Sequence, residues 1–193
     1  MRRICVSAGS NPGSDPAYAN SARDLARLLA ERGIGLVYGG GRVGLMGVLA
    51  DTVLEAGGEA IGVMPQALVD KEIGHTGLTE LHVVGSMHER KALMAELSDA
   101  FVAVPGGIGT LEELIEVYTW SQLGIHTKAC GVLNVAGYYD HLAAFLDHAV
   151  TAGFLKPAHR AVLTVANQPA ELLDRLAAYE PPVVGKWIEL DAT

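Results

Sequence analysis

The sequence predicts an α/β fold of the doubly wound, Rossmann-like class, with a mostly parallel seven-stranded sheet and helices on both faces. Two observations lead to this prediction. Short apolar runs rich in β-branched residues recur along the chain, and stretches with helical periodicity separate most of them. Because continuous apolar runs are typical of strands buried on both faces, and because helices lie between them, the strands are expected to run parallel.

The elements follow in order along the chain. The predicted strands cover residues 4–8, 34–38, 59–64, 81–84, 100–104, 129–135 and 161–165. Helical patterns occupy 17–33 and 45–58, each closed by glycine, and also 86–100 and 112–126. We expect residues 1–180 to form a single domain and 181–193 a C-terminal tail.

Composition and charge exclude several classes of partner. The chain has 193 residues, and its 14 basic against 22 acidic residues give a net charge of -8, which repels nucleic acid and anionic membranes. No run has the length of a signal-peptide core or a membrane span. Cys5 and Cys130 lie in strand-like runs, as core thiols do, so we expect a reduced, cytoplasmic protein. The histidines lack zinc-site spacing, so no metal is assigned.

The second predicted strand runs into GGGRVGLMG, residues 39–47, which contains G-x-G-x-x-G between a strand and a helix. An NAD site also needs an acidic residue at the end of the next strand, but that strand ends in Met64-Pro65. Two interpretations stay open. Backbone amides, with Gly40 and Gly44 as candidates, approach an anion or nucleotide, or the glycines serve a tight turn and close packing.

The fifth predicted strand ends in PGGIGTLEE, residues 105–113. Its glycines free successive amides to face a phosphate, and Thr110 can cap a helix that begins at Leu111. Thr110 and Glu113 also spell a capping box, so the residues alone leave Glu113 open between a helix cap and a catalyst. Without the lysine of an NTPase loop, ATP hydrolysis is not expected.

The fourth predicted strand leads into SMHERK, where Ser86 and Glu89 form a second possible capping box. Arg90 and Lys91 then fall near the start of a helix, where cations oppose the helix dipole. Either this helix holds an anion, or both side chains simply reach solvent. If the fourth and fifth strands are neighbours, Arg90 and Glu113 project into one crevice.

Two weaker signals accompany these motifs. Ser7, Ser10 and Asn11 follow the first strand and suit a base or sugar, although the same residues are ordinary turn and cap formers. The helix at 112–126 is apolar on more than one side, which indicates self-association.

Together, GGGRVGLMG, MHERK and PGGIGTLEE, followed by TWSQLGIHTKACGVLNVAGYYDHL, resemble the LOG family of cytokinin-activating phosphoribohydrolases, once labelled lysine decarboxylases. The similarity runs over nearly the whole chain, and every fixed position of P-G-G-x-G-T-x-x-E is matched. The resemblance implies a homodimeric hydrolase without a cofactor. Such an enzyme cleaves the N-glycosidic bond of AMP or its N6-prenylated forms and releases ribose 5-phosphate, but no motif marks the base preference.

The residues of this chain that match the family's motifs are expected to have the family's roles. The resemblance implies that Arg90 and Glu113 form the catalytic pair. The implied substrate- and phosphate-binding residues are Gly40, Gly44, Glu72, Met87, Lys91, Gly106, Gly107, Ile108, Gly109, Thr110 and Thr119. The alternative is a nucleotide or cofactor carrier of the same fold, as in the molybdenum-cofactor carriers, which needs the phosphate loop but has no use for the carboxylate.

Lysine decarboxylation is not expected. That chemistry needs a lysine in a Schiff base with pyridoxal phosphate. Lys91 lies beside Arg90 at a helix start, a position that favours binding anions, so the purified protein is expected to show no aldimine absorbance.

Overall fold

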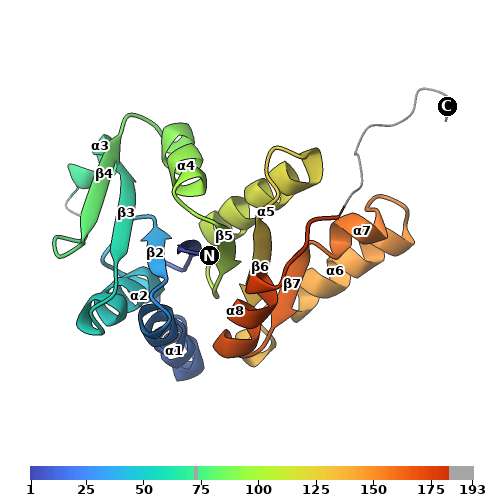
Figure 1. The fold of residues 1–193 in the computed structure, drawn as a ribbon, viewed down its shortest axis with the longest axis horizontal. Coiled ribbons are helices and arrows are strands. Elements are labelled where there is room, and N and C mark those ends of the chain that lie inside the picture. The colour runs from blue at the N-terminus through green and yellow to red at the C-terminus, as the bar shows by residue number, and fades with distance from the viewer. Residues whose placement is uncertain (72–73, 183–193) are drawn as a thin grey trace.

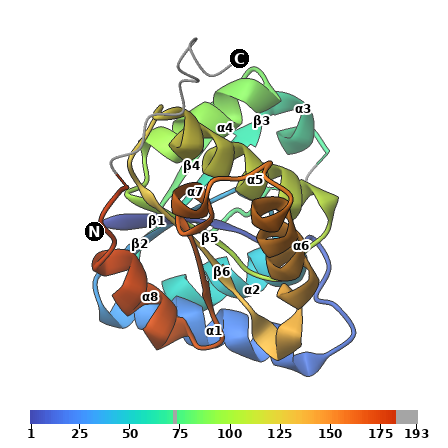
Figure 2. The same ribbon diagram turned by 90° about the vertical axis from the view of Figure 1, so that its right-hand side faces the viewer.

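The computed structural model describes residues 1–71 and 74–182 of the chain, and its sheet lies between two layers of helices (Figures 1 and 2). The strands are β1 (Arg3–Ser7), β2 (Gly35–Tyr38), β3 (Ala60–Pro65), β4 (Glu80–Val84), β5 (Ala100–Ala103), β6 (Ala129–Leu133) and β7 (Leu163–Ala166). The helices are α1 (Pro16–Glu31), α2 (Gly44–Glu55), α3 (Gln66–Val69), α4 (Met87–Glu96), α5 (Ile108–Leu123), the short 3-10 helix η1 (Val135–Gly137), α6 (Asp140–Thr151), α7 (Pro157–Arg160) and α8 (Pro169–Ala177).

The strand order confirms the predicted fold class. The sheet reads β4-β3-β2-β1-β5-β6-β7, and each neighbouring pair of strands is parallel. The chain first moves outward from β1 to β4, then returns across the sheet and continues from β5 to β7. The order therefore reverses between β1 and β5, and the crevice at the carboxyl ends of these two strands is where such folds bind ligands.

Side chains alternate between two cores because successive residues of a strand point to opposite faces. In β1, Ile4 and Val6 join the core beneath α1, α2 and α8, whereas Cys5 joins the core covered by α4, α5, α6 and α7. Figure 2 shows these two helix layers on either side of the sheet. Cys5 and Cys130 are buried free thiols whose pKa is raised by burial, to about 12 for Cys130, as expected of core residues.

Helix α1 illustrates how local sequence sets the elements. Asp15 caps it by accepting a hydrogen bond from the amide of Ala17 at 2.8 Å, and Pro16 occupies the first helical position. Its buried residues recur at helical spacing and are Ala22, Leu25, Ala26 and Leu29. The predicted tail at 181–193 lies, except for its first two residues, outside the described residues, and the division into domain and tail stays a prediction.

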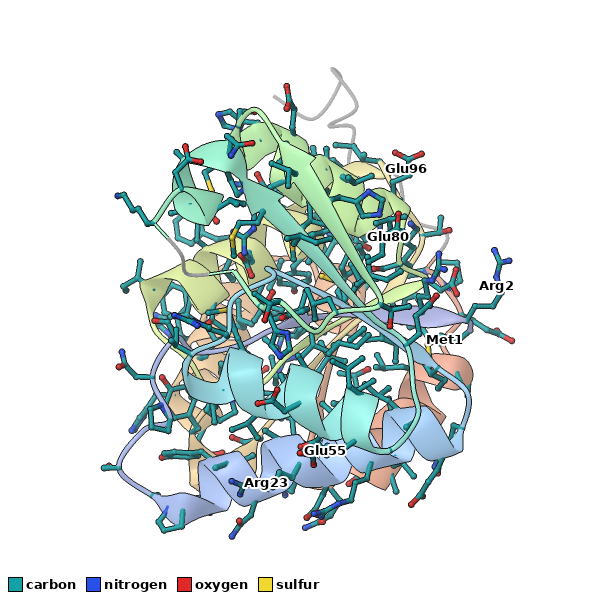
Figure 3. All side chains as sticks on the ribbon, turned by 90° about the vertical axis from the view of Figure 1, so that its left-hand side faces the viewer. Met1, Arg2, Arg23, Glu55, Glu80 and Glu96 are labelled. Carbon is teal, nitrogen blue, oxygen red and sulfur yellow. The ribbon has the colours of Figure 1, made fainter. Side chains whose placement is uncertain are left out.

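The amino ends of the strands carry charge of their own, away from the crevice. Arg3 donates to both carboxylate oxygens of Glu59, at 2.7 and 3.0 Å. The Arg3 hydrogen bond lowers the pKa of the Glu59 carboxyl. In Figure 3 the labelled Arg2 and Glu80 lie at this same end of the sheet. These contacts fasten β1 to the start of β3 and leave the opposite edge free for the site.

At the carboxyl edge, the loop after β1 packs directly on the start of α2. The amide of Leu45 donates to the carbonyl of Gly9 at 2.9 Å. Gly44 has a φ of 60°, and a Cβ there would lie 2.3 Å from the carbonyl carbon of Ser10 and 2.5 Å from the amide nitrogen of Asn11. Glycine is required at this position both for its φ and for the close approach of two backbones.

Replacing Gly44 by alanine is therefore expected to destabilise the fold strongly. The left-handed conformation costs about 1–2 kcal/mol for a residue with a Cβ, and overpacking against backbone adds about 1–3 kcal/mol. Gly33→Ala is the matched control, because Gly33 has a φ of 64° but nothing within 4 Å of its added Cβ. Urea unfolding should show a clearly larger loss for Gly44→Ala; equal losses would contradict the packing argument.

Candidate functional site

The second glycine-rich stretch opens helix α5 toward solvent. Gly107 is the N-cap, no side chain caps the helix, and an added Cβ on Gly107 or Gly109 would meet nothing within 4 Å. The first amides of a helix have no partners within it, and the helix dipole favours an anion there. The loop thus presents free amide donors at an open surface, which is the arrangement that binds phosphate.

The predicted start of this helix at Leu111, with Thr110 as its cap, is wrong. The helix begins at Ile108, because Gly107 adopts the extended cap conformation itself, with φ −86° and ψ −156°. Thr110 is buried, and its hydroxyl packs against Gly106, where a Cβ would lie only 2.1 Å away. Glu113 consequently lies in the second turn of α5 and is no part of a capping box.

Glu113 is paired with Arg90. Nη1 of Arg90 lies 3.1 Å from Oε1 of Glu113, and only 10% of the arginine side chain and 17% of the glutamate side chain are exposed. Ion pairs shielded in this way are screened by salt less than surface pairs are. The two residues meet although the condition of neighbouring strands is not fulfilled, because β4 and β5 are separated by β3, β2 and β1.

Arg90 reaches Glu113 because α4 crosses back over the sheet (Figure 1). The predicted cap of α4 is confirmed: the hydroxyl of Ser86 accepts from the amide of Glu89 at 3.1 Å, and the carboxylate of Glu89 accepts from the amide of Gly85. Nε of Arg90 donates to the carbonyl of Val63, within β3, at 3.1 Å. The guanidinium is therefore fixed from two sides.

The first glycine-rich loop provides the space for this guanidinium. A Cβ on Gly39 would lie 1.9 Å from Nη2 of Arg90, so only glycine leaves room for the arginine in this position. Gly44 is covered by the backbone of Ser10 and Asn11, and Gly40, with a φ of 77°, packs near Leu81. These contacts fit the close-packing interpretation of the loop, and its approach to an anion or nucleotide stays a prediction.

Lys91 forms a second link between α4 and α5. Its Nζ lies 2.6 Å from Oε1 of Glu112 and 2.9 Å from Oε1 of Glu116, and 11% of its side chain is exposed. The hydrogen bond to Glu112 is the main reason that the pKa of Lys91 is raised. Both cations of α4 thus hold carboxylates of α5, and the possibility that they simply reach solvent is excluded.

A cavity of about 270 Å³ lies at the point where the strand order reverses. The loops after β1 and β5 form two of its walls, and two tyrosines complete it. Its lining includes Gly9, Ser10, Asn11, Tyr18, Leu45, Pro105, Gly106, Gly107 and Tyr138. The rings of Tyr18 and Tyr138 meet edge to face with centroids 5.6 Å apart. Sequence reasoning missed both tyrosines; the available signal was the pair Tyr138-Tyr139 just after a strand end.

The remaining predicted residues are scattered around this centre. Met87, the first residue of α4, is 44% exposed, and Thr119 is half-buried in α5. Glu72 lies outside the described residues. Among residues 1–71 and 74–182, no three or more His, Cys, Asp or Glu side chains are grouped to hold a metal ion. Within the same ranges, no helix combines the length and apolar character needed to cross a membrane.

Comparisons with known proteins give matches over most of the chain. A family profile described as "Possible lysine decarboxylase" matches residues 46–176. The cytokinin riboside 5'-monophosphate phosphoribohydrolase LOG5 of Arabidopsis thaliana is 51% identical over 181 residues, covering 94% of this chain and 79% of that protein. LOG7 of the same plant, which carries the same enzyme name, is 49% identical over 196 residues, covering 99% and 90%.

Solved structures share the fold at lower identity. The molybdenum cofactor binding protein of Rippkaea orientalis superposes with a TM-score of 0.70 at 22% identity, covering 92% of this chain and 96% of that one. The molybdenum cofactor carrier protein of Chlamydomonas reinhardtii gives 0.70 at 24% identity, covering 93% and 99%. At this level of identity the likeness establishes the fold alone.

Lys91→Met is expected to lower the free energy of unfolding by about 1–2 kcal/mol, between the values for exposed and buried pairs. Because the pKa of Lys91 is raised in the folded state, its stabilisation is complete below the usual lysine value of about 10.4 and is lost as the pH rises further. Denaturation curves of the variant and the wild type should therefore converge at high pH. Lys71→Met, an exposed site, is the control and should show no such gap at neutral pH.

Proposed function

Since the chain belongs to the LOG family, we propose that it is a phosphoribohydrolase that cleaves the N-glycosidic bond of purine nucleoside 5'-monophosphates to free base and ribose 5-phosphate. The substrates are AMP, its N6-prenylated cytokinin forms, or both. The observation that carries the proposal is the shielded Arg90–Glu113 pair beside an open, glycine-rich helix terminus. A carrier needs the helix terminus but not the pair.

Glu113 supplies the charge that this reaction requires. When the bond between ribose C1' and the base nitrogen breaks, positive charge develops on the ribose ring, and a nearby carboxylate stabilises it. Water then forms the new bond to C1', and the departing base takes up a proton. Glu113 is also placed to orient or deprotonate this water. Arg90, held by the carbonyl of Val63, keeps the carboxylate in one position through the reaction.

The spacing along α5 fits the ribose 5-phosphate part of the substrate. Gly109 and Glu113 are four residues apart, so they lie on the same side of the helix about 6 Å from each other. A phosphate on the amides of the first turn thus places the ribose beside the carboxylate. The binding energy of the phosphate then holds the scissile bond in register with Glu113.

Pyridoxal phosphate chemistry does not fit these residues. A Schiff base requires a lysine that gives up its proton, but the Lys91 ammonium is held between two carboxylates and its pKa is raised. The decarboxylase description of the family profile is therefore not adopted for this chain, and no cofactor is proposed. We place the enzyme in the cytoplasm, where buried reduced thiols are usual.

Turnover by variants tests the proposal. Incubation with AMP and with isopentenyl-AMP should release free base and ribose 5-phosphate, detected by chromatography. Glu113→Gln and Arg90→Ala should each lower kcat by about 10²-fold or more, because they remove charge stabilisation or its positioning. Glu96→Gln is the control, since this exposed carboxylate is the last residue of α4, six residues beyond Arg90 (Figure 3).

The alternative class predicts another result. If the wild-type protein binds both nucleotides with measurable affinity but releases base from neither, it is a carrier of the same fold. Base release that survives in Glu113→Gln would also overturn the assignment of the catalytic carboxylate.

We further propose that the enzyme is a homodimer joined along α5. Ile115, Thr119 and Leu123 lie four residues apart and form one stripe of this helix. Ile115 is 38% and Leu123 is 47% exposed, and Ile125, just beyond the helix, is 65% exposed. Exposed aliphatic residues gathered on one helix face are typical of a protein interface. Thr119, a predicted substrate contact, would then lie at the contact between protomers.

Leu123→Asp is expected to convert the dimer to a monomer, because it places an unpaired charge in an apolar contact. Light scattering should report a mass of twice 20.3 kDa for the wild type and 20.3 kDa for the variant. Phe145→Asp on α6, where the ring is 63% exposed, serves as the matched control and should stay dimeric. Dissociation by Phe145→Asp alone would place the interface on α6 instead.

A further inference from the structure

The loop that opens α5 is held through its carbonyl groups. The hydroxyl of Tyr139 donates to the carbonyl of Val104 at 2.8 Å. The amide of Gly9 donates to the carbonyl of Pro105 at 3.2 Å. The hydroxyl of Tyr138 donates to the carbonyl of Gly106 at 2.5 Å. Each of these three successive carbonyls therefore has a donor from another part of the chain.

A hydrogen bond that fixes the direction of a backbone carbonyl also fixes the direction of the N–H of the next residue. In a trans peptide unit, the C=O of one residue and the N–H of the following residue point in opposite directions within one plane. The bond from Gly9 to Pro105 thus directs the amide of Gly106, and the bond from Tyr138 to Gly106 directs the amide of Gly107. The directions of the Gly106 and Gly107 amides, which lead into α5, are therefore fixed by hydrogen bonds to the carbonyls that precede them.

Gly107 needs such a restraint more than its neighbours do. It has no side chain, and an added Cβ would find no atom within 4 Å, so packing does not fix it. Glycine also has the widest backbone freedom of all residues. The Tyr138 hydroxyl bond is consequently the contact that restrains the peptide between Gly106 and Gly107.

Tyr138 directly follows η1, a turn that has one strained residue and is held by side-chain hydrogen bonds. Ala136 in η1 has a φ of 50°, a conformation that non-glycine residues rarely adopt. The side chain of Asn134 holds the turn by accepting from the amide of Tyr139 at 2.7 Å and donating to Asp140 at 2.8 Å. Backbone strain of this kind persists where the surroundings enforce it, and it gathers at functional sites.

We propose that Tyr138 is a positioning residue for the 5'-phosphate: its hydroxyl holds the Gly106 carbonyl so that the Gly107 amide faces the substrate. This inference rests on the proposed function, because it assigns the phosphate to the start of α5. Tyr139 and Asn134 support it by fixing the turn. Tyr138 also lines the 270 Å³ cavity together with Gly106 and Gly107.

The test is Tyr138→Phe, which keeps the ring and removes only the hydroxyl. Loss of one net hydrogen bond is expected to weaken binding of ribose 5-phosphate about two- to tenfold by calorimetry. Inhibition by free adenine, which lacks the phosphate, should be unchanged. Tyr118→Phe is the matched control, because it removes a tyrosine bond of the same kind, to the carbonyl of His159 at 2.9 Å.

The outcomes separate this inference from the proposed function. The positioning role of Tyr138 would be overturned if Tyr138→Phe and the wild type bound ribose 5-phosphate equally well. It would also be overturned if the variant lost affinity for adenine as much as for ribose 5-phosphate. Failure of the wild type to bind ribose 5-phosphate overturns it as well. Binding of ribose 5-phosphate without base release from nucleotides would remove the hydrolase but leave the positioning role of Tyr138 standing. Thermal unfolding of each variant checks that the fold is retained.

Discussion

The ion pairs between α4 and α5 are the interactions on which the site depends. α4 follows the edge strand β4, whereas α5 follows β5 on the far side of β1, so the sheet alone leaves their side chains apart. Arg90 pairs with Glu113, and Lys91 pairs with Glu112 and Glu116. Because the cations are largely shielded from solvent, these pairs are screened little and connect the two halves of the sheet across the crevice. The proposed catalytic pair, Arg90 and Glu113, is part of this connection.

Both glycine-rich loops follow a strand and lead into a helix, but the space beside their glycines differs. Around Gly39 and Gly44 the space left by the missing Cβ is filled by the protein, with the Arg90 guanidinium at one and the backbone of Ser10 at the other. Around Gly107 and Gly109 that space is open. The open surface around Gly107 and Gly109 leaves room for a phosphate beside their backbone, whereas the predicted ligand contacts of Gly40 and Gly44 stay predictions. The contacts at Gly39 and Gly44 come from residues distant in sequence.

Sequence reasoning succeeded where local patterns determine structure. The strands, their parallel arrangement and the Ser86 cap of α4 all follow from periodicity and nearby side chains. The start of α5 was wrong because T-x-x-E suggested a cap at Thr110, while Gly107 took that position through backbone freedom that no side chain marks. Arg90 and Glu113 were chosen by motif, and they meet although β4 and β5 are separated by three strands in the sheet.

The tyrosines beyond β6 could not have been assigned a role from the sequence. Tyr138 and Tyr139 act on main-chain carbonyls 32 and 35 residues earlier in the chain. Nothing in their own neighbourhood specifies those partners. A pair of tyrosines at the carboxyl end of a predicted strand indicates a place at the crevice edge, but which carbonyls they bind depends on the neighbouring strand β5. Glu72 and the single-domain division stay predictions.

The position of Arg90 has a consequence for how activity is lost. The Arg90 side chain contacts β3 through Val63, the loop after β2 through Gly39, and α5 through Glu113. A partly folded or proteolytically nicked form that lacks any one of these elements has no complete catalytic pair. The geometry of the proposed catalytic pair is therefore a cooperative property of these assembled elements, and a fragment without β3, the loop after β2 or α5 lacks part of it. A cell that degrades partly folded copies of this protein loses no catalysis by doing so.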